Sequence, residues 1–342
     1  MKTSTATTLF QRFCVSLFVV SVGLLSHSVR AQESYILATA TTGGTYYPVG
    51  VALATLVKVK LEPKAKISLA AISSAGSGEN VKLLRENQAQ FAILQGLYGA
   101  WAWAGEGQVK PDGPQKHLRS VTMLWQNVEH FTVRSEYAKS GLIDDLTNLK
   151  KKKFSIGKRN SGTEGSGRQI LSGLGIDPDQ MFDLVYQGYG PSAEALQNGT
   201  IAGMNTPAGV PVSAVAQAFA AMGDKITILG FNDDQIKQAN GNYDLWTPFK
   251  IPANTYSGQT KDVRTIAQPN FLAVRNEVPE ETVYQIIKTV YENLPFLNNI
   301  HKATKAMSLE GAIAGLPMPL HPGAARFYQE KGLEIPDRLI AK

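Results

Sequence analysis

The feature that most constrains this chain is a glycine and threonine loop that separates a predicted strand from a predicted helix. Residues 35–38 form an apolar run typical of a buried strand, and residues 47–60 carry apolar side chains at helical spacing. The loop between them contains Gly43, Gly44 and Thr45. Glycine lets the backbone approach a ligand closely, and the free amides of the following helix carry partial positive charge. The loop favours an anionic ligand, although a plain strand-to-helix turn with a threonine cap also explains it taken alone.

The same pattern recurs twice farther along the chain. A predicted strand at 67–72 leads into a serine and glycine loop, in which Ser77 is the expected N-cap of the next helix. A predicted strand at 153–157 leads into a third loop, residues 158–167, and another helix. Capping by chance explains each loop separately. Three loops at equivalent places, however, predict several helix N-termini that converge on one anion.

Strands and helices alternate through most of the chain. This alternation predicts an α/β protein with mostly parallel sheets, whose ligands lie outside the carboxyl ends of the strands. Further strands are expected at 91–94, 183–186, 201–204 and 226–229.

Two longer extended stretches, residues 119–134 and 265–274, are mostly apolar but contain polar interruptions. We interpret them as strands that cross between two lobes, so that the chain leaves lobe one, builds lobe two and returns. The interruptions are Gln126-Asn127 and Glu129-His130 in the first stretch and Gln268-Pro269-Asn270 in the second.

The amino terminus predicts secretion. The positively charged Lys2 and Arg12 precede the apolar run 13–25. Val29 and Ala31 supply the small side chains that a signal peptidase needs before a cleavage point after Ala31. We therefore predict that residues 1–31 are a signal peptide and that the mature protein is periplasmic; an uncleaved anchor is the alternative.

The remaining residues define the predicted domains. With 342 residues, 43% hydrophobic and 18% charged, the chain suits a globular protein of two lobes. Lobe one is expected to comprise residues 32–126 and 268–342, and lobe two residues 127–267.

Composition excludes several classes of function. The only cysteine, Cys14, lies in the predicted signal, so the mature chain would have no disulfide and no thiolate metal site. Cleavage also removes Lys2, Arg12 and Arg30, which lowers the formal net charge from +6 to +3. No dense basic stripe would remain, which argues against a nucleic acid partner. No histidine has metal-ligand spacing, so we expect neither a metal nor a cofactor.

Five motifs, taken in order, give the chain a resemblance to a known family. They are residues 43–50 (GGTYYPVG), the loop at 73–80, Ser161-Gly162-Thr163, residues 258–263 after Thr255-Tyr256, and residues 319–324 with Phe327-Tyr328. With them the mature chain resembles the TAXI family, the TRAP-associated extracytoplasmic immunogenic proteins that are solute-binding subunits of TRAP transporters. The resemblance covers essentially the whole mature chain.

The resemblance implies a type II periplasmic binding protein, with two α/β lobes, two crossing strands and a ligand cleft that closes by hinge motion. It implies capture of a small carboxylate, whether a dicarboxylate, an oxo or hydroxy acid or a glutamate-like amino acid, for a TRAP-type membrane permease. We expect a monomer. The positions that match the family's cleft are Gly44, Thr45, Tyr46, Ser77 and Gln95 in lobe one and Ser161, Gly162, Thr163 and Asn205 in lobe two.

The sequence departs from the family's pattern in one informative place. Gln95 is followed by Gly96 and Leu97, where the family commonly has a small residue and an aspartate. Loss of that carboxylate removes a partner for a ligand ammonium, which makes a glutamate-like ligand less secure. Arg159, near the third loop, could supply a bidentate clamp, whereas Arg168 is expected on the surface.

Two other functions stay open. A periplasmic sensing protein that presents its solute to a sensor kinase would have the same cleft. A secreted serine hydrolase would use Ser77 or Ser161 as nucleophile, with His130 as the one histidine that could approach the cleft. Neither serine lies in a Gly-x-Ser-x-Gly elbow, so we rank the hydrolase far behind.

Overall fold

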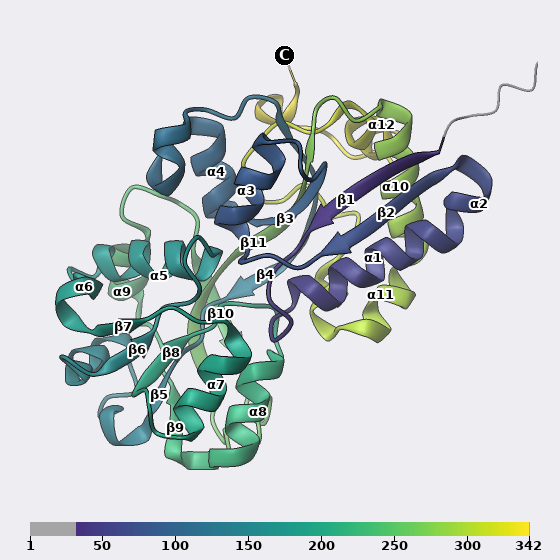
Figure 1. The fold of residues 1–342 in the computed structure, drawn as a ribbon. Helices are drawn as coiled ribbons and strands as arrows, with labels where there is room; N and C mark the ends of the chain where they lie inside the picture. Colours follow the sequence, from purple (N-terminus) through teal and green to yellow (C-terminus); the bar gives the residue numbers. More distant parts are fainter. Residues whose placement is uncertain (1–31, 342) are drawn as a thin grey trace, which may run out of the picture. The chain divides into compact units, whose positions relative to one another are not determined.

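Two mixed β-sheets with helices packed against them make up residues 32–341, the part of the chain that the computed structural model describes (Figure 1). These residues belong to one compact unit. The predicted signal peptide, with Cys14, lies outside the described residues.

The first sheet combines parallel strands with antiparallel crossing strands. Its order is β10-β11-β3-β1-β2, and β4 also pairs with β11. β1 is parallel to β2 and to β3, whereas β11 is antiparallel to β3, β4 and β10. The strands are β1 (Glu33–Ala38), β2 (Ile67–Ile72), β3 (Phe91–Gln95), β4 (Leu118–Val128), β10 (Thr247–Ile251) and β11 (Val263–Arg275).

The second sheet repeats this design with shorter strands. Its order is β7-β6-β8-β5-β9, with β6 parallel to β7 and β8 and with β5 antiparallel to β8 and β9. In the first sheet β2, β1 and β3 lie side by side in that order, and the crossing strand β11 follows. In the second sheet β7, β6 and β8 are arranged in the same way, and the crossing strand β5 follows. The strands are β5 (Phe131–Arg134), β6 (Lys153–Ser155), β7 (Asp183–Val185), β8 (Gly203–Asn205) and β9 (Ile226–Ile228).

The expected fold class is confirmed: the chain has two α/β lobes and strands that cross between them. The expectation of mostly parallel sheets was too simple, because each crossing strand enters its sheet antiparallel to its neighbour. The stretch 119–134 is two strands rather than one, since it breaks at Glu129 and His130 where the chain passes from the first sheet to the second. β10 was not expected; it is an exposed edge strand with weak apolar alternation.

Helix α1 shows why the predicted helices form. Val49, Leu53, Leu56 and Val57 are at most 4% exposed, and their spacing of four, three and one places them on one face of the helix. That face packs against β2. The loops before α1, α3 and α5 all follow the carboxyl ends of strands, as expected. The helices of the first lobe are α1 (Tyr46–Lys60), α2 (Glu62–Ala65), α3 (Ser77–Arg85), α4 (Gly96–Ala104), α10 (Glu280–Glu292), α11 (Leu294–Ile300) and α12 (Pro322–Glu330).

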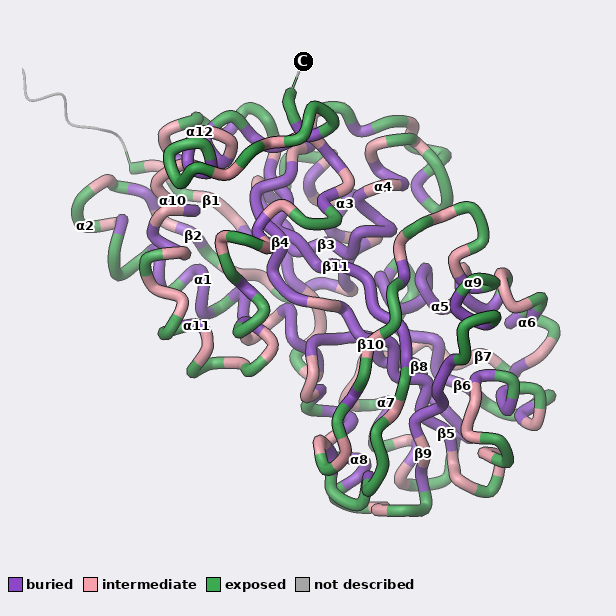
Figure 2. The backbone as a smooth tube through the Cα atoms, turned by 180° about the vertical axis from the view of Figure 1, so that it is seen from behind, coloured by how far each residue is buried: buried purple, intermediate pink, exposed green. Residues whose placement is uncertain are grey.

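The remaining helices surround the second sheet, and the central strands β3, β4, β8 and β11 are among the most buried parts of the described chain (Figures 1 and 2). No helix within residues 32–341 combines the length and apolar character needed to cross a bilayer. These helices are α5 (Gly162–Gly173), α6 (Pro178–Met181), α7 (Tyr189–Gln197), α8 (Ser213–Met222) and α9 (Asp233–Asn240).

Candidate functional site

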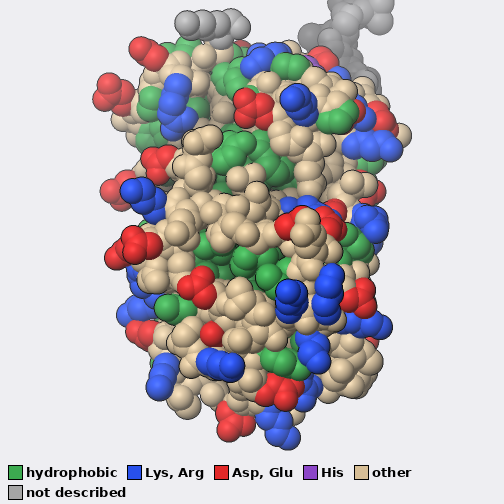
Figure 3. All heavy atoms as spheres, turned by 90° about the vertical axis from the view of Figure 1, so that its left-hand side faces the viewer, with side chains coloured by type: hydrophobic (Ala, Val, Ile, Leu, Met, Phe, Trp, Pro, Cys, Tyr) green, Lys and Arg blue, Asp and Glu red, His purple; other side chains and the backbone are tan. Residues whose placement is uncertain are grey.

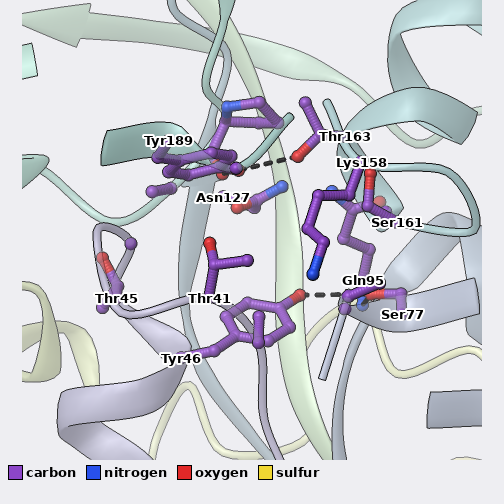
Figure 4. A pocket seen from close by; sticks show the side chains of 18 residues that line it. Thr41, Thr45, Tyr46, Ser77, Gln95, Asn127, Lys158, Ser161, Thr163 and Tyr189 are labelled. Carbon is purple, nitrogen blue, oxygen red and sulfur yellow. Dashed lines mark hydrogen bonds between the residues drawn. The ribbon is translucent and has the colours of Figure 1, made fainter. Parts of the chain in front are cut away.

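A small cavity lies where the glycine-rich loops of both lobes meet the crossing strand β4 (Figure 4). About 30 Å³ is open to the centre of a water-sized sphere. Loop residues of the first lobe form one wall and loop residues of the second form the other. The lining residues are Ala40, Thr41, Gly44, Thr45, Tyr46, Ala75, Gly76, Ser77, Gln95, Asn127, Lys158, Ser161, Gly162, Thr163, Gly188, Tyr189, Pro207 and Ala208.

Eight of the nine sequence-predicted site residues line this cavity. The structure brings together residues from four separate segments of the chain, because the loops sit at the carboxyl ends of strands that face one another. The eight are Gly44, Thr45, Tyr46, Ser77, Gln95, Ser161, Gly162 and Thr163. That they bind a ligand stays a prediction.

Asn205 is the predicted residue that does not line the cavity. It ends β8, and its side-chain Nδ2 donates a hydrogen bond to Glu129 Oε2 at 2.9 Å. Glu129 is fully buried, and this burial raises the pKa of its carboxyl to about 7 despite the bond from Asn205. Asn205 therefore supports a buried carboxyl group in the connection between β4 and β5.

The wall from lobe one is a hydrogen-bonded set of buried side chains. The Tyr46 hydroxyl donates to Asn270 Oδ1 at 2.6 Å, and Ser77 Oγ accepts from the backbone amide of Gln95 at 3.1 Å. The cap prediction for Ser77 was wrong by one position: Gly76 is the N-cap of α3, and Ser77 is its first residue. Burial raises the pKa of Tyr46, so its hydroxyl remains a donor throughout the physiological range.

The wall from lobe two is the N-terminus of α5. Ser161 caps this helix, since its Oγ accepts a hydrogen bond from the backbone amide of Glu164 at 3.0 Å. Thr163 Oγ1 lies 2.8 Å from the Tyr189 hydroxyl, which donates to the carbonyl oxygen of Pro207 at 2.5 Å. The first turn of α5 therefore faces the cavity with its partial positive charge, and its serine and threonine side chains are held in place.

Three functional candidates were missed in the sequence. Lys158 opens the third loop and is the only charged residue among the described residues that line the cavity. Tyr189 is the first residue of α7, shortly after the strand predicted at 183–186. Asn127 belongs to the polar interruption of the first crossing strand, and this break in an apolar strand was the signal that could have found it.

The arginines considered as a carboxylate clamp point elsewhere. Arg168 pairs with Asp179, with Nη1 2.6 Å from Oδ2, and also with Glu164. The Arg159 guanidinium lies 3.7 Å from the centre of the Tyr186 ring, so it forms a cation–π contact. Neither arginine lines the cavity.

The two lobes are in direct contact around the cavity. The Tyr98 hydroxyl, whose shorter hydrogen bond goes to Gln108 Oε1 at 2.6 Å, also lies 3.1 Å from the Ser161 carbonyl oxygen. The Thr45 hydroxyl donates to the Gly209 carbonyl oxygen at 3.1 Å. The contact depends on glycine: a Cβ at Gly165 would overlap the Tyr98 hydroxyl. The structure therefore shows the lobes closed over the cavity.

No histidine is among the described residues that line the cavity. His130 is fully buried: its Nδ1–H donates to the Val128 carbonyl oxygen, and its Nε2 accepts from the Tyr256 hydroxyl, both at 2.8 Å. Burial lowers the pKa of His130 to about 4, so the ring is neutral at pH 7. Within residues 32–341 no group of three or more His, Cys, Asp or Glu is suited to hold a metal ion.

Two α/β lobes joined by crossing strands, with a closed cavity between them, define the fold class as that of the two-lobed binding proteins. The chain belongs to the NMT1-like family, whose sequence profile matches residues 37–332. Solved structures share the fold. One is MatC from Rhodopseudomonas palustris with bound malate, at 14% identity and a TM-score of 0.54, covering 87% of this chain and 96% of that one. Another, described as a periplasmic transporter, has 14% identity and a TM-score of 0.51, covering 88% and 93%.

Proposed function

We propose that this protein is the extracytoplasmic solute-binding subunit of a TRAP transporter, of the TAXI type, and that it captures a small carboxylate. The observation that carries the proposal is the charge of the cavity, where Lys158 is the only charged residue among the described residues of the lining. Lys158 is an exposed residue whose side chain reaches the cavity wall, as Figure 4 shows, so its ammonium gives the cavity a positive charge that attracts an anion.

The N-terminus of α5 supports the same conclusion. Gly162 and Thr163 belong to its first turn and line the cavity, on a helix of 12 residues. The amides of a helix N-terminus bind anions, because they carry partial positive charge and have no partners within the helix. The small cavity suits a compact acid, such as a dicarboxylate, an oxo or hydroxy acid, or a glutamate-like amino acid.

Delivery to the permease follows from closure. The proposed lobes are residues 32–126 with 268–342 and residues 127–267, which move about the crossing strands. A ligand that contacts both lobes favours the closed state by its differential affinity, and the TRAP-type permease would bind that closed state. We propose that the protein acts as a periplasmic monomer after removal of its signal at about Ala31.

Differential scanning fluorimetry against a panel of small acids tests the proposal. A ligand that binds only the folded state raises the melting temperature, by an amount that grows with concentration above the dissociation constant. We expect a stabilising ligand among malate, lactate, pyruvate, 2-hydroxyglutarate, glutamate and their close relatives. Amines and sugars of similar size serve as controls, and stabilisation by these alone would contradict the proposal.

The two alternatives can be separated from transport. A sensing protein would bind the same solute, so a neighbouring gene for a sensor kinase in place of a multi-span permease would favour it. For a serine hydrolase, Ser161 Oγ already caps α5 and the described lining offers no histidine as base. Turnover of short acyl esters by the purified protein would favour the hydrolase.

A further inference from the structure

The side-chain amide of Asn127 faces the cavity with an unused donor. Asn127 is 0% exposed and lines the cavity, and its Nδ2 has no hydrogen-bond partner among the described residues. Figure 4 shows Asn127 between Tyr46 of lobe one and Tyr189 of lobe two. Leaving a buried N–H group without an acceptor costs free energy. A ligand atom that accepts a hydrogen bond from it recovers that free energy as binding affinity.

A chain of hydrogen bonds determines which atom of the amide is presented. The backbone amide of Gln95 can only donate, so Ser77 Oγ accepts from it at 3.1 Å and is left with its own proton to give. Ser77 Oγ lies 3.5 Å from the Tyr46 hydroxyl, which donates to Asn270 Oδ1 at 2.6 Å. The Tyr46 hydroxyl therefore has its single proton committed to Asn270 Oδ1.

The last step of the chain joins the two crossing strands. Asn270 of β11 accepts through Oδ1, so its Nδ2 is the donor, and it reaches Asn127 Oδ1 of β4 at 3.2 Å. Asn127 Oδ1 is therefore occupied as an acceptor. The hydrogen-bond network fixes the orientation of the Asn127 side-chain amide, and in that orientation its Nδ2–H is directed to the cavity. The polar interruptions in the two crossing strands thus have a common purpose.

We propose that Asn127 is a specificity residue that presents a fixed donor to a carboxylate or carbonyl oxygen of the ligand, and that the ligand is a small acid without an amine. This inference rests on the proposed function. An ammonium group at this position would meet a donor in place of an acceptor. Elsewhere, the described lining has no Asp or Glu with which an ammonium could pair, and its buried free acceptor, Gln95 Oε1, is a neutral oxygen that can accept from a ligand hydroxyl. Hydroxy and oxo acids meet both requirements.

Matched pairs of acids test the inference in the full mature protein by isothermal titration calorimetry. L-Malate and L-aspartate, L-lactate and L-alanine, and 2-hydroxyglutarate and L-glutamate each differ by a hydroxyl in place of an ammonium. We expect the wild-type protein to bind the hydroxy acid of at least one pair and to prefer it by tenfold or more. Equal or tighter binding of the amino acid in every pair that binds would overturn the inference and leave the proposed function standing.

Variants of the chain of hydrogen bonds provide the second measurement. Asn127→Leu should weaken binding of the hydroxy acid by about 10- to 100-fold, since it removes a hydrogen bond to a charged group of the ligand. Asn127→Asp, which replaces the donor by an acceptor, should also reduce the preference over the amino acid. Gln126→Leu is the matched control, because Gln126 is the preceding residue of β4 and does not line the cavity; it should bind as wild type.

Tyr46→Phe tests the chain itself. Loss of its hydroxyl leaves Asn270 and Asn127 free to turn over, so affinity should fall, and the effects of Tyr46→Phe and Asn127→Leu should be less than additive. If Asn127→Leu does not fold, Tyr46→Phe decides the matter alone. Wild-type affinity in the folded variants would overturn the inference. No binding of any acid by the wild-type protein would overturn the proposed function and the inference with it.

Discussion

The backbone amide of Glu79 donates a hydrogen bond to the carbonyl oxygen of Asn160 at 2.9 Å, and this bond joins the second glycine-rich loop to the third. The two residues belong to different lobes. Gly78 lies so close to the same carbonyl group that a Cβ there would overlap its oxygen. The closed arrangement thus requires a bare backbone at the contact, and its glycines serve closure as well as ligand approach.

Gly165→Ala should hinder closure. The added methyl group overlaps the Tyr98 hydroxyl only when the lobes are in contact, so the melting temperature without ligand should change little. We expect the affinity for the stabilising acid to fall by about tenfold or more, since an overlap in a packed contact costs about 1–3 kcal/mol. Titration calorimetry measures the loss. Gly190→Ala is the control, because a Cβ there meets open space; equal affinities in the two variants would contradict the expectation.

Thr45→Val should act through the same closure. The Thr45 hydroxyl donates to the Gly209 carbonyl oxygen, so its replacement removes a bond between lobes and leaves a similar shape. The expected loss of affinity is about 3- to 10-fold, the effect of one neutral hydrogen bond. Small-angle scattering with saturating ligand should show a larger open fraction than in the wild type. An unchanged affinity would remove Thr45 from the closing contacts.

Lys158→Met should weaken binding of the acid and should also change how that binding depends on salt. The ammonium is the only charge among the described residues of the lining, and a hydrogen bond to a charged partner contributes about 1.5–3 kcal/mol. Affinity should therefore fall by about 10- to 100-fold, and its dependence on salt should become weaker. Lys152→Met, at an exposed position outside the cavity, is the control. A steep salt dependence retained in Lys158→Met would contradict the role given to Lys158.

Glu129→Gln should change the pH dependence of stability in a defined direction. Burial raises the pKa of this carboxyl from 4.5 to about 7, so the folded protein holds the proton more tightly than the unfolded chain. The wild type therefore loses stability as the pH rises from about 4.5 to 7. Each unit of pKa difference corresponds to about 1.4 kcal/mol, so the loss is at most about 3.5 kcal/mol. Glutamine should remove this loss, so the stability of the variant relative to the wild type should rise as the pH goes from about 4.5 to 7.

The neighbouring His130 changes stability in the opposite direction, and the comparison must allow for it. Its lowered pKa of about 4 makes the protein lose stability as pH falls from 6.5, since the unfolded chain takes up the proton first. This contribution is common to wild type and Glu129→Gln and cancels in their difference. Denaturant unfolding at several pH values measures that difference. A value that stays constant from pH 4.5 to 8 would show that the Glu129 pKa is not raised.

The sequence by itself determined the local elements. Helical spacing in 47–60, the apolar run at 67–72 and the loops rich in glycine, serine and threonine depend on neighbouring residues, so strand, loop and helix could be predicted in their correct order. It also indicated that the loops share one edge, which brought eight of the nine predicted residues to the cavity.

Only the tertiary structure decided how side chains from distant segments meet. Asn127 and Asn270 are 143 residues apart, and their bond exists because β4 and β11 pair antiparallel. Asn205 points to Glu129 because of the sheet to which β8 belongs. Periodicity reports which side of an element is buried, but it does not report which partner buries it, because packing and hydrogen bonding between elements depend on their arrangement in space.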